Sequence, residues 1–365
     1  MGKSYLKYFA VVSGELLIML LAFSCRKDAR KSDPVNFAKI GLYEQFTGGI
    51  NRRLIIAVLG IGNQATAYGC IFDTGSTGMT IDANGILPAS MISSSGFQIA
   101  GDSVNVNGIT VTTQEAIVTY GDVGNQVREY GNLAYAPVTI GEASSGVVTT
   151  PRIPIFLYYK VINLATGQKL AAHSVDVFGV GPGVSYTSKL IASPLSYFNL
   201  APDVTSGFRL AALKGGNFTS APTFVPDLLF IGLTPKDLNA SGFTMHPLTS
   251  VSVTGYSSSI NTSINYNGQT IQSPVLFDTG TPATSIIMNS KTFSNVTVLP
   301  ANTSITLTTS GGFNYQYTTT SNYNLTMVES TSYSHDTRSV FSIDFFLENQ
   351  FLIDYTNHNI GLKNN

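Results

Sequence analysis

The chain has 365 residues, of which 43% are hydrophobic, and its formal net charge is -1. This length predicts two domains or one large unit of two lobes, with enough apolar residues for a sizeable core. The near-neutral charge gives no electrostatic basis for binding nucleic acid, so we expect no nucleic-acid partner. Only 11% of the residues are charged, whereas 34 are glycine. This composition favours strands and tight turns over helices.

The N-terminus has the pattern of a targeting segment. Lys3 and Lys7 precede an apolar run over 16–23, which is too short to span a bilayer. Ser24 and Cys25 follow, and this ending resembles a bacterial lipoprotein signal, in which the Cys is lipidated. We therefore expect residues 1–25 to be a lipoprotein-type signal with Cys25 as the lipidation site. An ordinary cleaved signal or a buried N-terminal helix is the alternative.

Residues 26–48 are then predicted to be a solvated tether that holds the protein to a membrane of the bacterial cell envelope. If Cys25 carries lipid, Cys70 is left alone and no internal disulfide is available. A lone thiol in a strand-like run is most often inert core. The four histidines show no metal-ligand spacing, so we expect neither a metal nor another cofactor.

Strand-like runs follow along the chain at the short spacing of an all-β protein. The apolar run 51–64 ends in a Gly-rich turn, and the alternating run 103–113 is divided by an Asn-Gly turn signal. Another alternating run covers 115–122. From 249 to 326 the chain is polar but still alternates, which predicts exposed strands.

Two stretches favour helices. Residues 186–198 are one, and residues 234–238 are the other because they open with Thr and Pro. The glycines of 59–63 do not open a helix, so a dinucleotide-binding fingerprint is not expected there.

A short phrase occurs twice in the chain. The segment Asp73–Ser76 reads Asp-Thr-Gly-Ser after an apolar pair, and Asp278–Thr281 reads Asp-Thr-Gly-Thr after another. An isolated buried carboxylate is unfavourable unless it is paired or its pKa shifts. Two acids in matching frames predict that each is the partner of the other, at the interface of two similar lobes. We place these lobes at 49–212 and 213–365.

Two carboxyl groups that share a water cannot both ionise, so such a pair holds one proton. The ionised member can take a proton from the water while the protonated member polarises a peptide carbonyl, which is general acid–base hydrolysis. Hydroxyls at Ser76 and Thr281 can bond a carboxylate and favour its ionised form, which predicts an acidic optimum.

The other motif residues have supporting roles in this interpretation. Gly75 and Gly280 allow tight turns and close approach of the backbone. The hydroxyls of Thr74 and Thr279 can bond across to the opposite lobe.

At these residues the sequence resembles the pepsin-like aspartic proteases. Residues 59–76 are similar to the entry strand and first catalytic loop of the family. Residues 118–141 are similar to its flap hairpin, with Tyr120 and Gly121 at the flap position, although Tyr120 alone would most often be a half-buried strand aromatic. Residues 340–362 are similar to the closing segment of the family.

The resemblance covers most of residues 50–365. It implies an all-β, bilobed fold of two pseudo-twofold-related lobes with a central cleft. It also implies a monomeric endopeptidase that binds its polypeptide substrate in an extended conformation, with Asp73 and Asp278 as the catalytic residues. Substrate contacts are implied for Gly75, Ser76, Tyr120, Gly121, Gly280 and Thr281, with Thr74 and Thr279 in support.

The chain departs from the family pattern at two positions. Ser342 stands where a Gly is expected, and Thr80 stands where family members often have Trp, so the support of Tyr120 is open. The segment 25–51 is too short for a typical inhibitory propeptide. These departures leave room for a catalytically silent binding protein on the same scaffold, and a structural surface lipoprotein without a cleft is a third interpretation.

Overall fold

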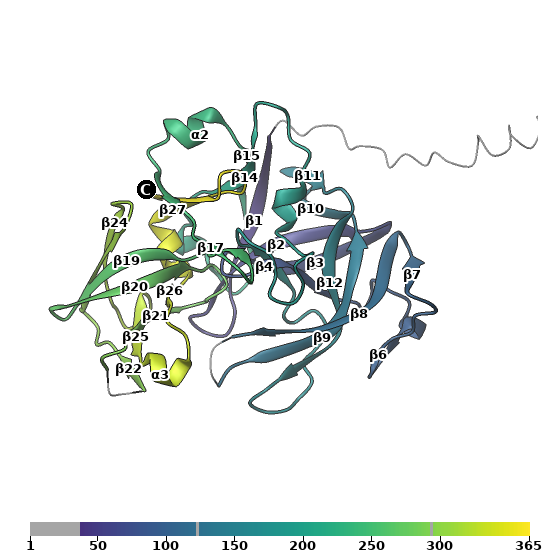
Figure 1. Ribbon diagram of the computed structural model, residues 1–365, viewed down its shortest axis with the longest axis horizontal. Helices are drawn as coiled ribbons and strands as arrows, with labels where there is room; N and C mark the ends of the chain where they lie inside the picture. Colours follow the sequence, from purple (N-terminus) through teal and green to yellow (C-terminus); the bar gives the residue numbers. More distant parts are fainter. Residues whose placement is uncertain (1–36, 122–123, 293–294) are drawn as a thin grey trace, which may run out of the picture. The chain divides into compact units, whose positions relative to one another are not determined.

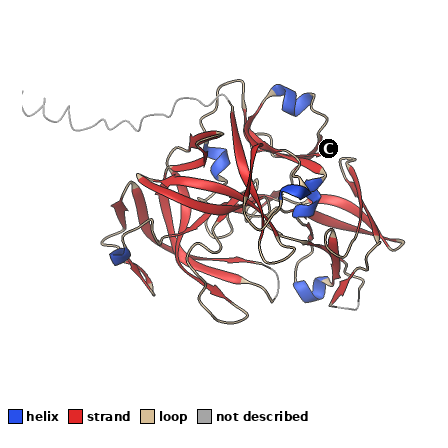
Figure 2. Ribbon diagram, turned by 180° about the vertical axis from the view of Figure 1, so that it is seen from behind, coloured by secondary structure: helices blue, strands red, loops and turns tan. Residues whose placement is uncertain are grey.

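The computed structural model describes residues 37–121, 124–292 and 295–365, all within one unit, Pro34–Asn365. Strands dominate this unit (Figures 1 and 2), which confirms the all-β prediction. The predicted signal, Cys25 and the first part of the tether lie outside the described residues. In the described ranges no helix is long and apolar enough to cross a bilayer.

The larger of two main sheets has sixteen strands and includes the principal strands of the N-terminal lobe. Its principal order is β16-β28-β27-β14-β15-β1-β2-β3-β13-β4-β12-β9-β8-β7, with β10 and β11 branching from β2. Its strands are β1 Ala38–Phe46, β2 Arg52–Ile61, β3 Gln64–Asp73, β4 Thr77–Asp82, β7 Ser103–Val106, β8 Ile109–Tyr120, β9 Val127–Ala136, β10 Val138–Glu142, β11 Gly146–Thr149, β12 Ile153–Asn163, β13 Val177–Val180, β14 Thr205–Leu210, β15 Thr223–Leu233, β16 Thr244–Pro247, β27 Asn349–Asp354 and β28 Asn359–Asn364.

The second main sheet has eight strands and belongs to the C-terminal lobe, in the order β22-β25-β21-β26-β20-β19-β23-β24. Its strands are β19 Ile260–Tyr266, β20 Gln269–Phe277, β21 Thr284–Met288, β22 Val296–Val298, β23 Ser304–Thr309, β24 Asn314–Thr318, β25 Leu325–Glu329 and β26 Ser339–Phe341. The minor elements are the pairs β5 Ile92–Ser93 with β6 Gly96–Phe97 and β17 Ser250–Val251 with β18 Gly255–Tyr256, and the short helices α2 Pro235–Asn239 and α3 Thr331–Ser334.

The two lobes repeat one strand arrangement around their Asp-Thr-Gly loops. In the N-terminal lobe, β3 ends at Asp73 and pairs in parallel with β13, and β13 pairs antiparallel with β4 on its other side. In the C-terminal lobe, β20 pairs in parallel with β26, and β26 pairs antiparallel with β21. Each Asp-Thr-Gly loop therefore connects two strands, β3 and β4 or β20 and β21, and a third strand, β13 or β26, lies between them.

The structure corrects two expectations about local structure. The tether predicted over 26–48 contains β1, whose inner side chains are buried between β2 and β15, so residues 38–46 belong to the folded body. Residues 186–198 form no α-helix, only a 3₁₀ turn at Pro194–Tyr197. Pro194 cannot continue a helix and disfavours helical backbone in the residue before it.

Other local predictions are confirmed. The Asn-Gly signal within 103–113 is the turn between β7 and β8, where both Asn107 and Gly108 have positive φ. The helix predicted at 234–238 is the short helix α2, Pro235–Asn239, whose N-cap Thr234 forms a reciprocal capping box with Asp237. The polar stretch 249–326 consists mainly of strands of the C-terminal lobe, as predicted, but only one face of these strands is exposed, because alternate side chains of β19, β23 and β24 are buried.

A buried carboxyl group in β1 predicts a pH-dependent stability. Glu44 is fully buried, and its Oε2 has no hydrogen-bond partner. Burial raises its pKa from an ordinary 4.5 to about 7 against weaker opposing hydrogen bonds from Lys214 and Asn217. The folded state therefore holds a proton that the unfolded state releases between these values, so this contribution to stability is lost as pH rises through about 7.

We expect replacement by Gln to remove that dependence. The difference in unfolding free energy between Glu44→Gln and the wild type should grow in favour of the variant, by up to about 3 kcal/mol, as pH rises from below 4.5 to above 7. Urea unfolding followed by circular dichroism at several pH values measures this difference. A difference that does not change with pH would contradict the assignment.

Candidate active site

Asp73 and Asp278 lie in two loops that face each other, one after β3 and one after β20. A Cβ atom on Gly75 would lie 2.5 Å from the carboxyl carbon of Asp278, and one on Gly280 would lie 2.7 Å from that of Asp73. The two carboxyl groups are also hydrogen-bonded to each other. Each acid therefore lies against the opposite loop, at a place where only glycine leaves room for it. The structure brings together the two acids that the sequence singles out.

Each carboxyl group also accepts hydrogen bonds within its own loop. Oδ1 of Asp73 accepts the backbone N–H of Gly75 at 2.7 Å, and Oδ2 accepts the Ser76 hydroxyl at 2.6 Å. The second loop repeats both bonds on Asp278, from the backbone N–H two residues on at 2.7 Å and from the Thr281 hydroxyl at 2.6 Å. Both carboxyl groups thus have fixed orientations.

The threonines of the two motifs join the lobes directly behind the acids. The Thr74 hydroxyl donates to the carbonyl oxygen of Phe277 at 2.8 Å, and the Thr279 hydroxyl donates to that of Phe72 at 2.6 Å. Each of these hydroxyls accepts the backbone N–H of the other threonine at 3.0 Å. All of these atoms are buried, so this reciprocal set fixes the position of one loop relative to the other.

Burial and the neighbouring acid decide the charge of the pair. Burial raises the pKa of Asp73 well above its ordinary value, and the negative charge of Asp278 raises it further. The hydrogen bonds from Ser76 and Gly75 oppose this rise. The arrangement therefore favours one proton on the pair and one ionised oxygen beside it.

Tyr120 ends β8 in the β8–β9 hairpin, and its side chain lies near the first Asp-Thr-Gly loop. The side chains of Thr80 and Ser76 lie beside its hydroxyl and oppose the rise of its pKa, and the Ser76 hydroxyl donates to Asp73. Gly121 follows at the turn with φ of 90°. Thr80, which stands where the resemblance implies a tryptophan, therefore lies beside the tyrosine hydroxyl.

The serine that replaces a family glycine also fits its place. Ser342 is fully buried, and its hydroxyl donates to the carbonyl oxygen of Ala283 at 3.2 Å and accepts from the Ser285 hydroxyl at 3.3 Å. The equivalent position in the N-terminal lobe, Gly179, has no such room, because a Cβ there would lie 2.7 Å from a backbone oxygen. Ser285 and Ser342 therefore form a matched pair in the C-terminal lobe.

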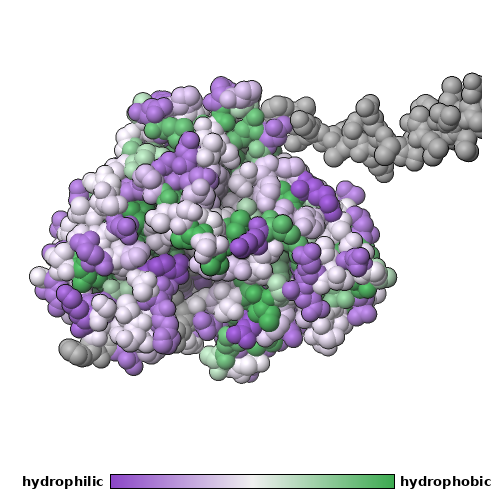
Figure 3. Space-filling view, in the orientation of Figure 1, coloured by the Kyte–Doolittle hydropathy of each residue, from purple (hydrophilic) through white to green (hydrophobic). Residues whose placement is uncertain are grey.

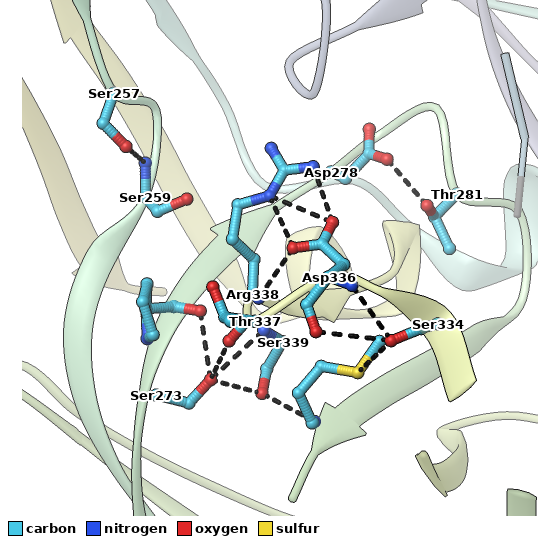
Figure 4. A network of polar contacts seen from close by, with 12 residues as sticks. Ser257, Ser259, Ser273, Asp278, Thr281, Ser334, Asp336, Thr337, Arg338 and Ser339 are labelled. Carbon is cyan, nitrogen blue, oxygen red and sulfur yellow. Dashed lines mark hydrogen bonds and ion pairs between the residues drawn. The ribbon is translucent and has the colours of Figure 1, made fainter. Parts of the chain in front are cut away.

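Sequence reasoning missed several charged residues around the site. Arg53 of β2 donates to the carbonyl oxygen of Gly280. Arg338 forms a two-pronged ion pair with Asp336 near Asp278 (Figure 4). Glu129 of β9 is fully buried and accepts the Thr80 hydroxyl at 3.3 Å. None of these residues belongs to a motif, and only the strand pairing brings them here.

The described parts of the chain contain no group of three or more His, Cys, Asp or Glu residues placed to hold a metal ion. Cys70 is a free thiol buried in β3.

Comparison with known proteins places the fold. Neither a protein family nor a curated protein matches the amino-acid sequence. Among solved structures, an aspartic proteinase from Irpex lacteus is similar, with a TM-score of 0.59, 19% identity and coverage of 90% of this chain and 97% of that chain. Basic 7S globulin from soybean is also similar, with a TM-score of 0.55, 12% identity and coverage of 90% and 96%. The chain therefore has the bilobed, all-β fold of pepsin-like proteins.

Proposed function

We propose that the protein is an aspartic endopeptidase in which Asp73 and Asp278 activate a water molecule. The observation that carries this proposal is the contact of the two carboxyl groups across the lobe interface, each against the glycine of the opposite loop. A protein that only binds peptides has no physical need for two coupled acids held this way.

The chemistry follows from the shared proton. The ionised carboxylate accepts a proton from water as the water oxygen attacks the peptide carbonyl carbon. The protonated carboxyl donates its proton to the carbonyl oxygen, which gives a neutral tetrahedral diol. Transfer of a proton to the peptide nitrogen then accompanies cleavage of the C–N bond, and the pair again holds one proton. No covalent bond to the protein forms.

The surface near the site suits an extended peptide. The molecular surface has a hollow between the C-terminal lobe and the β8–β9 hairpin (Figure 3). We propose that a substrate lies there as a strand, with main-chain hydrogen bonds supplying affinity and side-chain pockets supplying selectivity. The substrate contacts are assigned to Gly75, Ser76, Tyr120, Gly121, Gly280 and Thr281.

A digest tests the function directly. Purified protein is incubated with a proteome-derived peptide mixture across acidic and neutral pH, with and without a statine-type transition-state mimic, and the new termini are read by mass spectrometry. We expect cleavage that is strongest at acidic pH and is blocked by the mimic. Absence of cleavage at every pH, with the mimic still bound, would favour the catalytically silent binding protein.

The flap tyrosine offers a second test of the same site. Replacement of Tyr120 by Phe removes only the hydroxyl, which lies beside Thr80 and Ser76 and can hydrogen-bond one of them. We expect kcat/KM to fall about three- to tenfold, since a neutral hydrogen bond contributes about 0.5–1.5 kcal/mol. Tyr130→Phe on β9 is the matched control and should leave kcat/KM unchanged. A Tyr120→Phe enzyme with wild-type kcat/KM would remove the hydroxyl from the proposed site.

We also propose that Cys25 anchors the protein to a membrane of the bacterial cell envelope and that the folded part acts as a monomer. The support is the sequence pattern before Cys25. Metabolic labelling with a fatty-acid analogue should mark the wild type and not Cys25→Ser. Labelling of both would contradict the assignment.

A further inference from the structure

Arg53 places a positive charge beside the two acids. It extends from β2, and its Nη1 donates to the carbonyl oxygen of Gly280, the residue whose backbone N–H binds Asp278. Most of the surface of Arg53 is buried. None of the ion pairs among the described residues includes Arg53. The guanidinium is therefore a partly buried cation at the second Asp-Thr-Gly loop, and the charges of Asp278 and Asp73 act on it.

The electrostatics of Arg53 agree with this placement. Burial lowers the pKa of its guanidinium, and the negative charges of Asp278 and Asp73 oppose that effect. A guanidinium stays charged throughout the range in which carboxyl groups titrate. The pair of acids therefore always titrates in the field of this charge.

The other ionisable groups around the pair do not supply an equivalent charge. Arg338 also lies near Asp278, but its guanidinium is bound by both oxygens of Asp336 (Figure 4). Tyr120 is a neutral phenol, because burial raises its pKa well above the ordinary value. Burial likewise raises the pKa of Glu129, the acid nearest to that phenol, so it is neutral at acidic pH.

We propose that Arg53 sets the pH range of the site, because its unneutralised charge stabilises the ionised carboxylate and so preserves the one-proton state of the pair down to more acidic pH. This inference rests on the proposed peptidase function for its meaning, but the ionisation of the pair can be measured without turnover. Arg53 acts through the acids and is a positioning residue rather than a catalytic one.

The sign of the effect follows from charge alone. A nearby cation favours loss of both protons from the pair, so it shifts the acid limb and the alkaline limb of the pH profile to lower pH. Removing the cation should shift both limbs upward. At the effective dielectric of a partly buried site, one unit charge within several ångströms shifts the pKa of a carboxyl group by about one to two units.

Substitutions can separate the charge from the hydrogen bond. Arg53→Gln keeps an N–H donor for Gly280 and removes the charge, whereas Arg53→Lys keeps the charge. Arg53→Met is a second charge-free variant in case the Gln variant does not fold. The double variant Arg338→Gln/Asp336→Asn is the matched control, because it removes an ion pair beside Asp278 without changing the net charge.

The readout is alkylation of the acids by an epoxide. The ionised carboxylate attacks an epoxide carbon, the ring C–O bond breaks, and the protonated partner acid supplies the proton to the epoxide oxygen, so labelling needs the one-proton state of the pair. Mass spectrometry at Asp73 and Asp278 gives the labelling rate at each pH, and peptide cleavage gives the pH dependence of kcat/KM. We expect both limbs to move up by about one to two pH units in Arg53→Gln and in Arg53→Met. Arg53→Lys and the double variant should stay close to the wild type.

The outcomes separate the two proposals. The role of Arg53 would be overturned if the pH profiles of labelling of Arg53→Gln and the wild type superimposed. It would also be overturned if the pH profile of the double variant shifted as far as that of Arg53→Gln. Both results hold whether or not peptides are cleaved. Shifted labelling in a protein that cleaves no peptide would uphold Arg53 and reject the peptidase. Absence of labelling at either acid at any pH would contradict both.

Discussion

Replacement of either Asp73 or Asp278 by Asn should abolish peptide cleavage while the protein stays folded. Asn has nearly the same size as Asp, and its carbonyl oxygen can still accept the backbone N–H of Gly75 or Gly280. It cannot hold the exchangeable proton or the negative charge on which the chemistry depends. Since positioned proton transfer contributes about 10²–10⁴-fold for each group, kcat should fall by at least that factor.

The same substitutions should not destabilise the fold. Asp73→Asn removes an acid that is buried next to a second acid, so the free energy of unfolding should be unchanged or higher. Asp227→Asn is the control, because that carboxyl group is about half exposed and lies within strand β15. Cleavage by purified Asp73→Asn or Asp278→Asn at more than about a hundredth of the wild-type rate would contradict the roles given to the pair.

Replacement of Arg52 by Met should cause the largest loss of stability outside the apolar core. Nη1 of Arg52 in β2 lies 2.6 Å from Oδ1 of Asp344, and the two side chains are only 8% and 2% exposed. The guanidinium also lies over the rings of Phe46 and Phe218, at 5.2 and 5.6 Å. Loss of the cation leaves a buried carboxylate without its partner across the lobes, which costs about 3–5 kcal/mol.

A second substitution separates the unpaired charge from the lost packing. In Arg52→Met/Asp344→Asn no charge is left buried, and the Asn oxygen can still accept the backbone N–H of Asn324, which Asp344 accepts at 2.6 Å. We therefore expect the double variant to be more stable than Arg52→Met alone. The chain has no Trp, so urea unfolding is followed by circular dichroism. Equal stability of Arg52→Met and the wild type would show that this pair does not hold the lobes together.

Local sequence signals predicted the elements whose geometry is set by neighbouring residues. The Asn-Gly turn at Asn107 and the capped start of α2 at Thr234 are of this kind. The repeated Asp-Thr-Gly phrase predicted the meeting of two distant acids, because a buried acid needs a partner and the phrase offered only one candidate. The fold class follows from the same alternation and turn signals.

Long-range pairing determined what the sequence could not predict. β1 follows the charged run 26–33 in the sequence, which favoured a solvated tether. It belongs to the folded body because β2 and β15 pair with its two edges. Arg53 is one of two adjacent arginines at the start of an apolar strand, and only the register of β2 directs it to Gly280 of the second Asp-Thr-Gly loop while Arg52 faces Asp344. The contact of Thr80 with Tyr120 joins two strands that the chain alone does not align.

The binding of a statine-type mimic to wild-type and variant protein tests the shared proton most directly. Such a mimic places a hydroxyl between the two acids and needs one donor and one acceptor there. Isothermal titration calorimetry should show one mimic bound per chain at acidic pH. The affinity should fall as the pH is raised and the pair loses its one remaining proton. Binding should be weakened in both Asp73→Asn and Asp278→Asn. Equal affinity in the wild type and both variants would show that Asp73 and Asp278 do not form one catalytic pair.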